Sequence, residues 1–251
     1  NTSNAPVTVR VEGGAATGVA QFDNAYLYLG DTYNFYSGVH GRDSYDDAGG
    51  AIIATLRYCD WRRSCPVANA FAQNTADSSA IVFGDFWAVD DVVAHEYTHK
   101  VTAFESGLIY TNISGAINES LSDVWGEFID QVNGRATDTA AVKWQLGEDL
   151  SGGALRSMKN PPLFNNPDRL TSALYQPENN PADNGGVHSN SGVNNKLCYL
   201  LTDGDTFNGQ TVTSMGVTQV VKLYYEAQTD LLTSSADWTD LFNALMQAAI
   251  N

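Results

Sequence analysis

The chain has 251 residues, 43% of them hydrophobic and 11% aromatic, a balance typical of a globular protein and not of a disordered one. No apolar run approaches the roughly 20 residues that a membrane-spanning helix needs, so we expect no association with a membrane. The formal net charge of −16 argues against nucleic-acid partners, because so acidic a surface repels phosphates. The same charge suits a secreted protein that stays in solution, and also one that collects cations.

The chain begins NTSNAPVTVRVEGG, without an initiator Met or the basic and apolar segments of a secretory leader. We therefore expect a mature, zymogen-derived form that acts outside the cell. Cys59 and Cys65 bracket a short polar segment, and we predict a disulfide between them in an oxidising compartment. Cys198 lies in an apolar stretch, which favours a buried small side chain over a nucleophile.

The first ninety residues show a mixed pattern of strands and one helix. Residues 5–14 alternate as a strand does before a glycine turn. Residues 22–39 have apolar side chains at helical spacing, with Asp23 as a candidate N-cap. Residues 51–59 and 78–86 are typical of strands, and the second contains an apolar run short enough to be a buried strand.

From Val89 onward the pattern is mostly helical. A first helix runs to Gly107 and a second ends at Asn133-Gly134, because glycine favours the left-handed conformation in which helices stop. The second helix carries an apolar stripe that we expect to face the core: Ile117, Leu121, Val124, Trp125, Phe128 and Val132. Residues 151–186 then form a long loop, which is unusual unless the loop is functional or held by ligands.

Three further amphipathic helices complete the chain, at residues 189–201, 216–228 and 235–250. We therefore predict an α+β fold of two lobes. The N-terminal α/β lobe, residues 1–105, contains the strands and ends with the first histidine-bearing helix. The C-terminal lobe, residues 106–251, is mainly helical.

Two of the four histidines lie four residues apart in the stretch DDVVAHEYTHKVTAFE. Residues i and i+4 share one face of a helix, so His95 and His99 can bind one ion. Glu96 points to an adjacent part of the helix, where a carboxylate can reach a water on the metal without ligating the metal. This is the His-Glu-x-x-His pattern of zinc sites, and the alternative is a coincidence within an apolar run.

A catalytic zinc needs a third protein ligand and an open position. Glu119, on the next helix, supplies that ligand. Asp123 and Asp130 share its helix face, and a solvated acidic face is the usual explanation of such a pattern. Carboxylates directed at a neighbouring helix are costly, however, unless cations neutralise them. Asp123 and Asn118 are also placed to accept the ring N–H groups of the two histidines and so fix their tautomers.

Four blocks in order carry a family resemblance: VVAHEYTH, GLIYTNISGAINESLSD, ALRSM and DNGGVHSNSG. They resemble the successive signature blocks of the thermolysin-like neutral metalloproteases, and the resemblance runs from about Ala25 to the C-terminus. The nineteen residues between His99 and Glu119 match this family, whereas the related aminopeptidases have one fewer. The resemblance implies two lobes with the active-site cleft between them, and hydrolysis of internal bonds in proteins and peptides.

The resemblance also implies a role for each polar residue of the site. One catalytic zinc on His95, His99 and Glu119 would polarise a water and the scissile carbonyl, with Glu96 as the general base.

His188 and Tyr110 match the family residues that donate hydrogen bonds to the developing oxyanion. Asp183, five residues before His188, would orient that imidazole. For His188 alone, a structural histidine in the core is the competing interpretation. His40 has no motif around it, and we expect it to be structural or on the surface.

Further residues match the part of the family that binds substrate. Arg156 matches the arginine that bonds the substrate carbonyl beyond the cut, although a surface arginine lying over apolar residues is the alternative. Asn69 and Ala70 match the segment that pairs with an extended peptide backbone. Val92, Leu146 and Leu155 match the positions that line the family's specificity pocket. The resemblance therefore implies a preference for a bulky apolar residue at P1′, just after the cleaved bond.

The resemblance also implies structural calcium beside the zinc helix. Asp91, Asp130 and Glu148 occupy positions that match the calcium ligands, with Gln145 able to contribute only carbonyl oxygens. Lys143 stands where members with two calcium ions have a bridging Asp, and we expect its ammonium to compete with a second cation. The sequence therefore predicts one calcium ion here.

Two other functions compete with a secreted endopeptidase. A catalytically dead zinc-binding or adhesion module could share the scaffold, but such a protein would be free to lose Glu96, Tyr110, His188 and Asp183. An exopeptidase of the wider family would need a group that binds the free amine of the substrate, and we recognise no such group in the sequence. We expect a monomer.

Overall fold

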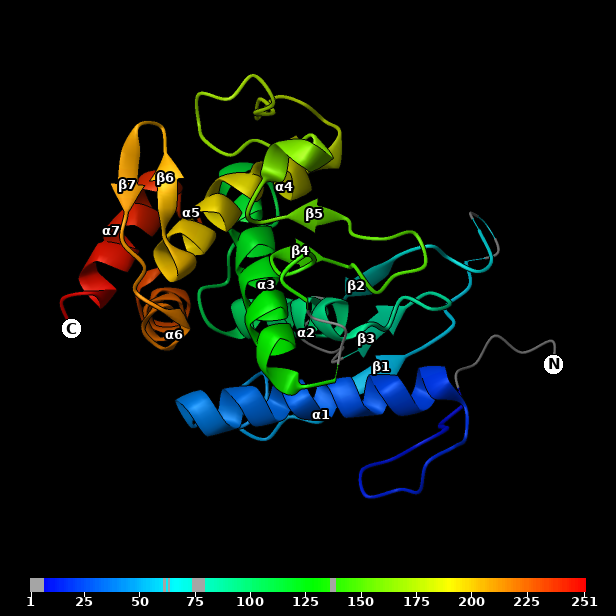
Figure 1. The fold of residues 1–251 in the computed structure, drawn as a ribbon. Helices are drawn as coiled ribbons and strands as arrows, with labels where there is room; N and C mark the ends of the chain where they lie inside the picture. Colours follow the sequence, from blue (N-terminus) through cyan, green and yellow to red (C-terminus); the bar gives the residue numbers. More distant parts are fainter. Residues whose placement is uncertain (1–6, 61, 63, 74–79, 136–138) are drawn as a thin grey trace.

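The computed structural model describes residues 7–60, 62, 64–73, 80–135 and 139–251 of the chain. A long helix and a small sheet make up the N-terminal part, and the C-terminal part is mainly helical (Figure 1), which confirms the predicted α+β fold. In the part of the chain that the structure describes, we find no helix with the length and apolar character required to cross a membrane.

The N-terminal part contains α1 (Ala20–His40), β1 (Ile53–Thr55), β2 (Ala70–Ala72) and β3 (Ala80–Phe83). The strands predicted in residues 51–59 and 78–86 are β1 and β3, which pair in parallel. The unpredicted β2 pairs antiparallel with the other side of β3, so the strand order is β1-β3-β2. In this sheet β2 is therefore an outer strand.

Two predictions near the N-terminus are wrong. Residues 7–14 form no strand, and the alternating Val7, Val9 and Val11 are exposed, because alternation supplies no partner strand to pair with. The N-cap of α1 is Val19 instead of Asp23. The Asp23 carboxylate in the first turn accepts the N–H groups of Thr17 and Gly18, and so fixes the loop before the helix.

Two long helices, α2 (Asp90–Phe104) and α3 (Asn112–Asn133), pack against each other at the centre of the molecule. The predicted α3 stripe is buried except for Val132, which is 56% exposed because it lies in the last turn. Gly134, with φ of 69°, ends α3 as predicted. By contrast, α2 ends at Phe104, before the predicted stop at Gly107.

The three helices predicted after residue 188 are present. The C-terminal elements are β4 (Gln145–Leu146), β5 (Arg156–Ser157), η1 (Pro161–Phe164), α4 (Asp183–Asn190), α5 (Gly192–Asp203), β6 (Asp205–Phe207), β7 (Gln210–Val212), α6 (Val217–Glu226), the π-helical turn η2 (Ala227–Leu231) and α7 (Trp238–Ala248). Sequence analysis missed the β6–β7 hairpin, although its Asn208-Gly209 turn is a strong hairpin signal.

The cysteines and the remaining histidine follow the sequence analysis. Cys59 and Cys65 form the predicted disulfide, and Cys198 is free and fully buried. His40 is structural, since its ring stacks on Tyr225 with a centroid distance of 3.8 Å. Burial and the charges of Arg42 and Lys222 lower the pKa of His40 to about 4, so the ring stays neutral at pH 7.

Gly126 allows α3 to cross the start of α2 at close range. A Cβ atom at this position would lie 2.9 Å from the carbonyl oxygen of Asp91 and 3.2 Å from Cδ1 of Leu146. The absence of a side chain therefore sets the distance between the two helices.

We expect Gly126→Ala to lower the free energy of unfolding by about 1–3 kcal/mol, because the added methyl must push α3 away from α2. Gly30→Ala in α1 is the matched control. Nothing lies within 4 Å of a Cβ at Gly30, so this change should stabilise the protein by about 0.5–1 kcal/mol. Urea denaturation measures both variants, and equal stabilities would contradict the prediction.

Candidate active site

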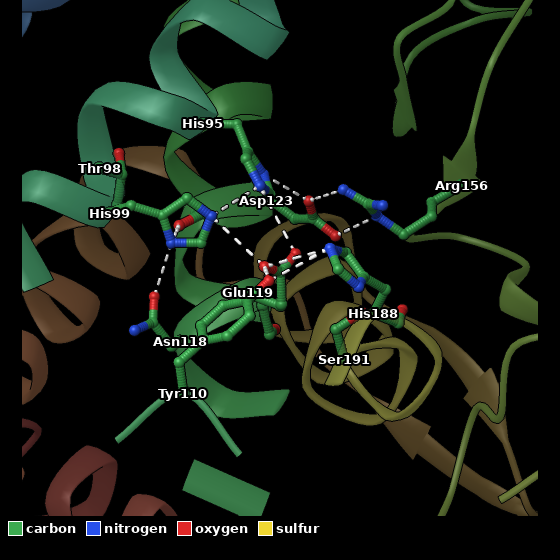
Figure 2. Close-up of polar contacts among 12 residues, drawn as sticks. His95, Thr98, His99, Tyr110, Asn118, Glu119, Asp123, Arg156, His188 and Ser191 are labelled. Atoms are coloured by element: carbon green, nitrogen blue, oxygen red, sulfur yellow. Dashed lines mark hydrogen bonds and ion pairs between the residues drawn. The ribbon is translucent and has the colours of Figure 1, made fainter. Parts of the chain in front are cut away.

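The two central helices bring the predicted metal-binding side chains together (Figure 2). Successive turns of α2 present His95 and His99, and α3 presents Glu119 opposite them. All three side chains are buried, because α2 lies within the hydrophobic core. Polar groups this deep need specific partners, and the facing helix supplies them.

The three donor groups lie close to a common point. His99 Nε2 is 3.1 Å from His95 Nε2 and 3.4 Å from Glu119 Oε1, and His95 Nε2 is 3.5 Å from Glu119 Oε2. Ligands bound tetrahedrally to zinc at about 2.0–2.1 Å are roughly 3.3 Å apart. The donor set therefore fits zinc. Among the described residues, no other three His, Cys, Asp or Glu side chains converge in this way.

The other ring nitrogens of the two histidines are held from behind. His95 Nδ1 lies 2.8 Å from Asp123 Oδ1, and His99 Nδ1 lies 2.7 Å from Asn118 Oδ1. Both rings therefore turn their Nε2 atoms toward the common point. Ser122 Oγ is also 3.1 Å from His99 Nδ1. Sequence analysis missed Ser122, although its position three residues after Glu119 places it near the same helix face.

Arg156, on β5, forms a two-bond ion pair with Asp123. Its Nε and Nη2 atoms donate to the two carboxylate oxygens over 2.8 and 2.7 Å. Burial alone would raise the pKa of Asp123, but Arg156 and His95 hold it below the ordinary value. Asp123 is therefore ionised and acts only as an acceptor.

A second set of polar side chains, Tyr110, His188 and Asp183, lies next to Glu119. The Tyr110 hydroxyl donates to Glu119 and lies 3.2 Å from His188 Nε2. His188 Nδ1 bonds to Asp183, whose other oxygen accepts the backbone N–H of His188 over 3.0 Å. Residues 183–186 all have positive φ and form a tight left-handed turn before the regular part of α4. Glycine adopts this conformation readily, which suits Gly185 and Gly186 to the turn.

The charges of this group favour particular protonation states. Burial opposes ionisation of Glu119, yet His188, His99 and His95 hold its pKa well below the ordinary value. Burial and the Glu119 charge raise the pKa of Tyr110, so its hydroxyl remains a donor. Burial alone would lower the pKa of His188, but Glu119 and Asp183 raise it.

Glu96 is buried beside the three donors. Its Oε2 atom makes no hydrogen bond within the part of the chain that the structure describes. Burial raises the pKa of Glu96, while His95 and His99 act in the opposite direction. An unbonded carboxylate oxygen in such a place is suited to a water or a substrate group.

The residues predicted to bind substrate come from three elements. Asn69 is exposed and directly precedes β2, where Ala70 lies on the outer strand of the sheet. Val92 is buried in the first turn of α2, and Leu146 is buried in β4. Leu155 is 38% exposed, and its N–H donates to the carbonyl of Leu146 over 2.7 Å.

The predicted calcium residues lie around the start of α2. Asp91 accepts the backbone N–H groups of Val92 and Gly147. Burial, and then the charge of Glu148, raises the pKa of Asp91 well above its ordinary value. Asp130 is also buried, whereas the Gln145 side chain turns back to the carbonyl of Ala141.

Lys143 forms an ion pair with a carboxylate on α5. Its ammonium lies 3.0 and 3.2 Å from the two carboxylate oxygens of Asp203, at a partly exposed position. Because Asp203 supplies a carboxylate on α5, the Lys143 ammonium has a partner there.

Comparison with known proteins agrees with this geometry. A His-Glu-x-x-His helix with a glutamate on the next helix defines a class of zinc-dependent hydrolases. Residues 15–103 match the family model described as thermolysin metallopeptidase, catalytic domain. Residues 106–251 match the model described as thermolysin metallopeptidase, alpha-helical domain. The chain belongs to the thermolysin metallopeptidase family.

Individual relatives support this assignment. A zinc metalloproteinase of Renibacterium salmoninarum is 44% identical over an alignment 256 residues long. The alignment covers 95% of this chain and 46% of that protein. A thermolysin of Alicyclobacillus acidocaldarius subsp. acidocaldarius is 38% identical over 239 residues, or 90% of this chain and 40% of that protein. The chain thus spans less than half the length of these relatives.

A solved structure shows the same fold. The precursor of protealysin, a metalloproteinase from Serratia proteamaculans, superposes with a TM-score of 0.80 at 30% sequence identity. The match covers 99% of this chain and 78% of the protealysin precursor.

We expect the zinc affinity to rise with pH. Burial alone would lower the pKa of His99, but Glu119, Glu96 and the bond to Asn118 raise it from 6.5 to about 9. Zinc binds only the neutral ring, so a proton must leave first. The affinity should rise about tenfold per pH unit below pH 9 and level off above it.

Chelator competition from pH 6.5 to 8.5 measures this dependence, with the titration of the chelator itself determined in parallel. An affinity that does not change over this range would contradict the raised pKa of His99.

Proposed function

We propose that this chain is the catalytic part of a secreted zinc endopeptidase that hydrolyses internal bonds in proteins and peptides. The observation that carries the proposal is the convergence of His95, His99 and Glu119 beside the buried carboxylate of Glu96. Three protein ligands leave one position open, as catalytic zinc sites require. Bound there, zinc would lower the pKa of a water and polarise the scissile carbonyl.

Asp123 and Asn118 prepare the two histidine ligands. Asn118 accepts the Nδ1 proton of His99, and the Asp123 carboxylate lies 2.8 Å from Nδ1 of His95, so that the Nε2 lone pairs face the metal position. Asp123 also places negative charge behind His95, which makes this imidazole a stronger donor.

Glu96 is the general base. It lies on the same helix as the two histidines, and its unbonded oxygen is available to take a proton from the attacking water. Burial raises the pKa of this carboxyl, and a raised pKa brings a carboxylate nearer to the range in which it exchanges protons at neutral pH. Glu96 then gives the proton to the leaving amine.

Tyr110 and His188 stabilise the oxyanion that develops on the scissile carbonyl. Both contact Glu119 Oε1 from the open side of the site, and substrate would take the place of this contact. Asp183 fixes the His188 ring through Nδ1, and Glu119 and Asp183 raise its pKa, which favours the protonated ring that donates from Nε2.

The outer strand β2 binds the substrate backbone. Ala70 offers main-chain groups and Asn69 an exposed amide, so an extended peptide can add to the sheet as a further strand. Main-chain pairing of this kind tolerates many sequences. Arg156, held by Asp123, donates to the substrate carbonyl beyond the cut.

The residue after the cleaved bond enters an apolar pocket formed by Val92, Leu146 and Leu155. Their positions at the start of α2 and on the β4–β5 hairpin put aliphatic side chains beside the zinc helix. Such a pocket favours a bulky apolar side chain at P1′.

One calcium ion stabilises the start of α2. Asp91, Asp130 and Glu148 would supply carboxylate oxygens and Gln145 its main-chain carbonyl. Among the described residues these carboxylates do not converge as the zinc ligands do, so they would have to close around the ion. The chemistry of these donors fits a hard cation, because burial and the Glu148 charge make a second negative charge at Asp91 unfavourable without one.

The chain acts as a monomer outside the cell, with its two lobes divided between residues 1–105 and 106–251. The disulfide and the acidic composition support an extracellular location.

We expect Glu96→Gln to retain zinc but to hydrolyse casein about 10²–10⁴-fold more slowly, because the amide cannot accept the proton of the water. Glu12→Gln, the same change at an exposed carboxylate, is the control and should be fully active. Bound metal is measured by elemental analysis of both variants. The cut sites in casein should be internal and precede Leu, Phe or Ile.

Two outcomes would replace the proposal. Cleavage only at chain ends would indicate an exopeptidase, and zinc binding without any cleavage would indicate a catalytically dead module.

We expect removal of calcium to lower the melting temperature, because Asp91 and Glu148 then repel each other. Melting is compared in EDTA with added zinc, with and without excess calcium. Asp91→Asn is the matched variant, since it removes one of the two charges and should reduce the dependence on calcium. A melting temperature that does not respond to calcium would refute this site.

A further inference from the structure

Behind His95, a chain of buried polar side chains runs through the C-terminal lobe. The Tyr224 hydroxyl lies 2.8 Å from Asn194 Oδ1, and Asn194 Nδ2 lies 2.8 Å from Ser120 Oγ. Ser120 Oγ lies 2.6 Å from Asn195 Oδ1, and Asn195 Nδ2 lies 2.7 Å from Asp123 Oδ2. We call these five residues the Asp123 relay.

The relay crosses three helices that are adjacent in the fold. Tyr224 lies on α6, Asn194 and Asn195 on α5, and Ser120 and Asp123 on α3. The three helices pack against one another, and α5 contacts both α3 and α6. The innermost member, Asp123, contacts the Nδ1 atom of His95 on α2.

All five side chains are at least 99% buried. Apolar side chains of similar shape would pack between these helices at little or no cost, because replacing both partners of a hydrogen bond by apolar groups can be nearly neutral. Helix packing alone therefore does not require this polar path. The path ends at Asp123, which contacts the metal ligand His95, and this position indicates its role.

All bonds of the relay run in one direction. The Asp123 carboxylate is paired with Arg156 and accepts, so Asn195 presents its NH₂ group to it. The Asn195 oxygen then needs a donor, which is the Ser120 hydroxyl, and the Ser120 oxygen in turn accepts from Asn194. All donors consequently point toward Asp123, an arrangement in which each bond strengthens the next.

The relay completes the surroundings of the Asp123 carboxylate. Oδ1 accepts from Arg156 Nη2 and lies 2.8 Å from His95 Nδ1, and Oδ2 accepts from Arg156 Nε and Asn195 Nδ2. Four nitrogen atoms thus surround a carboxylate that has roughly four acceptor positions. Three different elements, α2, β5 and α5, therefore fix its orientation.

We propose that Tyr224, Asn194, Ser120 and Asn195 are positioning residues, which set the zinc affinity by orienting Asp123 and, through it, His95. The inference rests on the proposed zinc site. Among the described residues, these four side chains are joined by hydrogen bonds to one another and to Asp123, so they act on His95 through Asp123.

Three variants test the relay: Tyr224→Phe, Ser120→Ala and Asn195→Leu. Tyr224→Phe removes a single oxygen and keeps the shape of the core, so it remains informative if a larger change fails to fold. Chelator competition should show zinc binding about tenfold weaker for Asn195→Leu and about threefold weaker for the other two. With zinc in excess, kcat should fall while KM stays unchanged.

Thr202→Val is the matched control. Its hydroxyl is also buried on α5, but donates to the carbonyl of Cys198, outside the relay. This variant should lose stability without any change in zinc affinity.

The outcomes separate the relay from the zinc site itself. If the wild type binds no zinc, the proposed function fails and the relay with it. If the wild type binds zinc and the relay variants bind it as tightly as Thr202→Val does, the relay is overturned and the zinc site stands.

Discussion

The contact between α2 and α3 is the constraint on which the rest of the structure depends. Two histidines from one helix and a glutamate from the other meet within 3.1–3.5 Å. Donor atoms on separate helices hold such distances only if the helix backbones are fixed. The close approach at Gly126 and the apolar side chains around α3 provide that rigidity.

The same contact brings several charged side chains into the interior, where each lies next to a partner of opposite charge. Arg156 neutralises Asp123, and the histidines favour the ionised form of Glu119. A buried charge is costly alone and much less so when paired and fully hydrogen-bonded. The site is thus prepared for a cation by groups that already balance each other.

Preparation of the site extends outward in layers. Asn118, Ser122 and Asp123 hold the rings of the histidine ligands, and Asn195 holds Asp123. On the other side of the ligands, Tyr110 and His188 contact Glu119. The buried side chains hold the ligands in place, whereas His188 is half-exposed.

The sequence by itself determined whatever depends on local spacing. The four-residue interval of His95 and His99 places both on one helix face, and glycine after Asn133 ends α3. The short interval between Cys59 and Cys65 likewise predicted their bond. Only the tertiary structure decided which distant groups meet. Lys143 reaches Asp203 across 60 positions, and Asn195 reaches Asp123 across 72 positions. Periodicity reports which face of an element is apolar, but the partner of that face depends on how the whole chain packs.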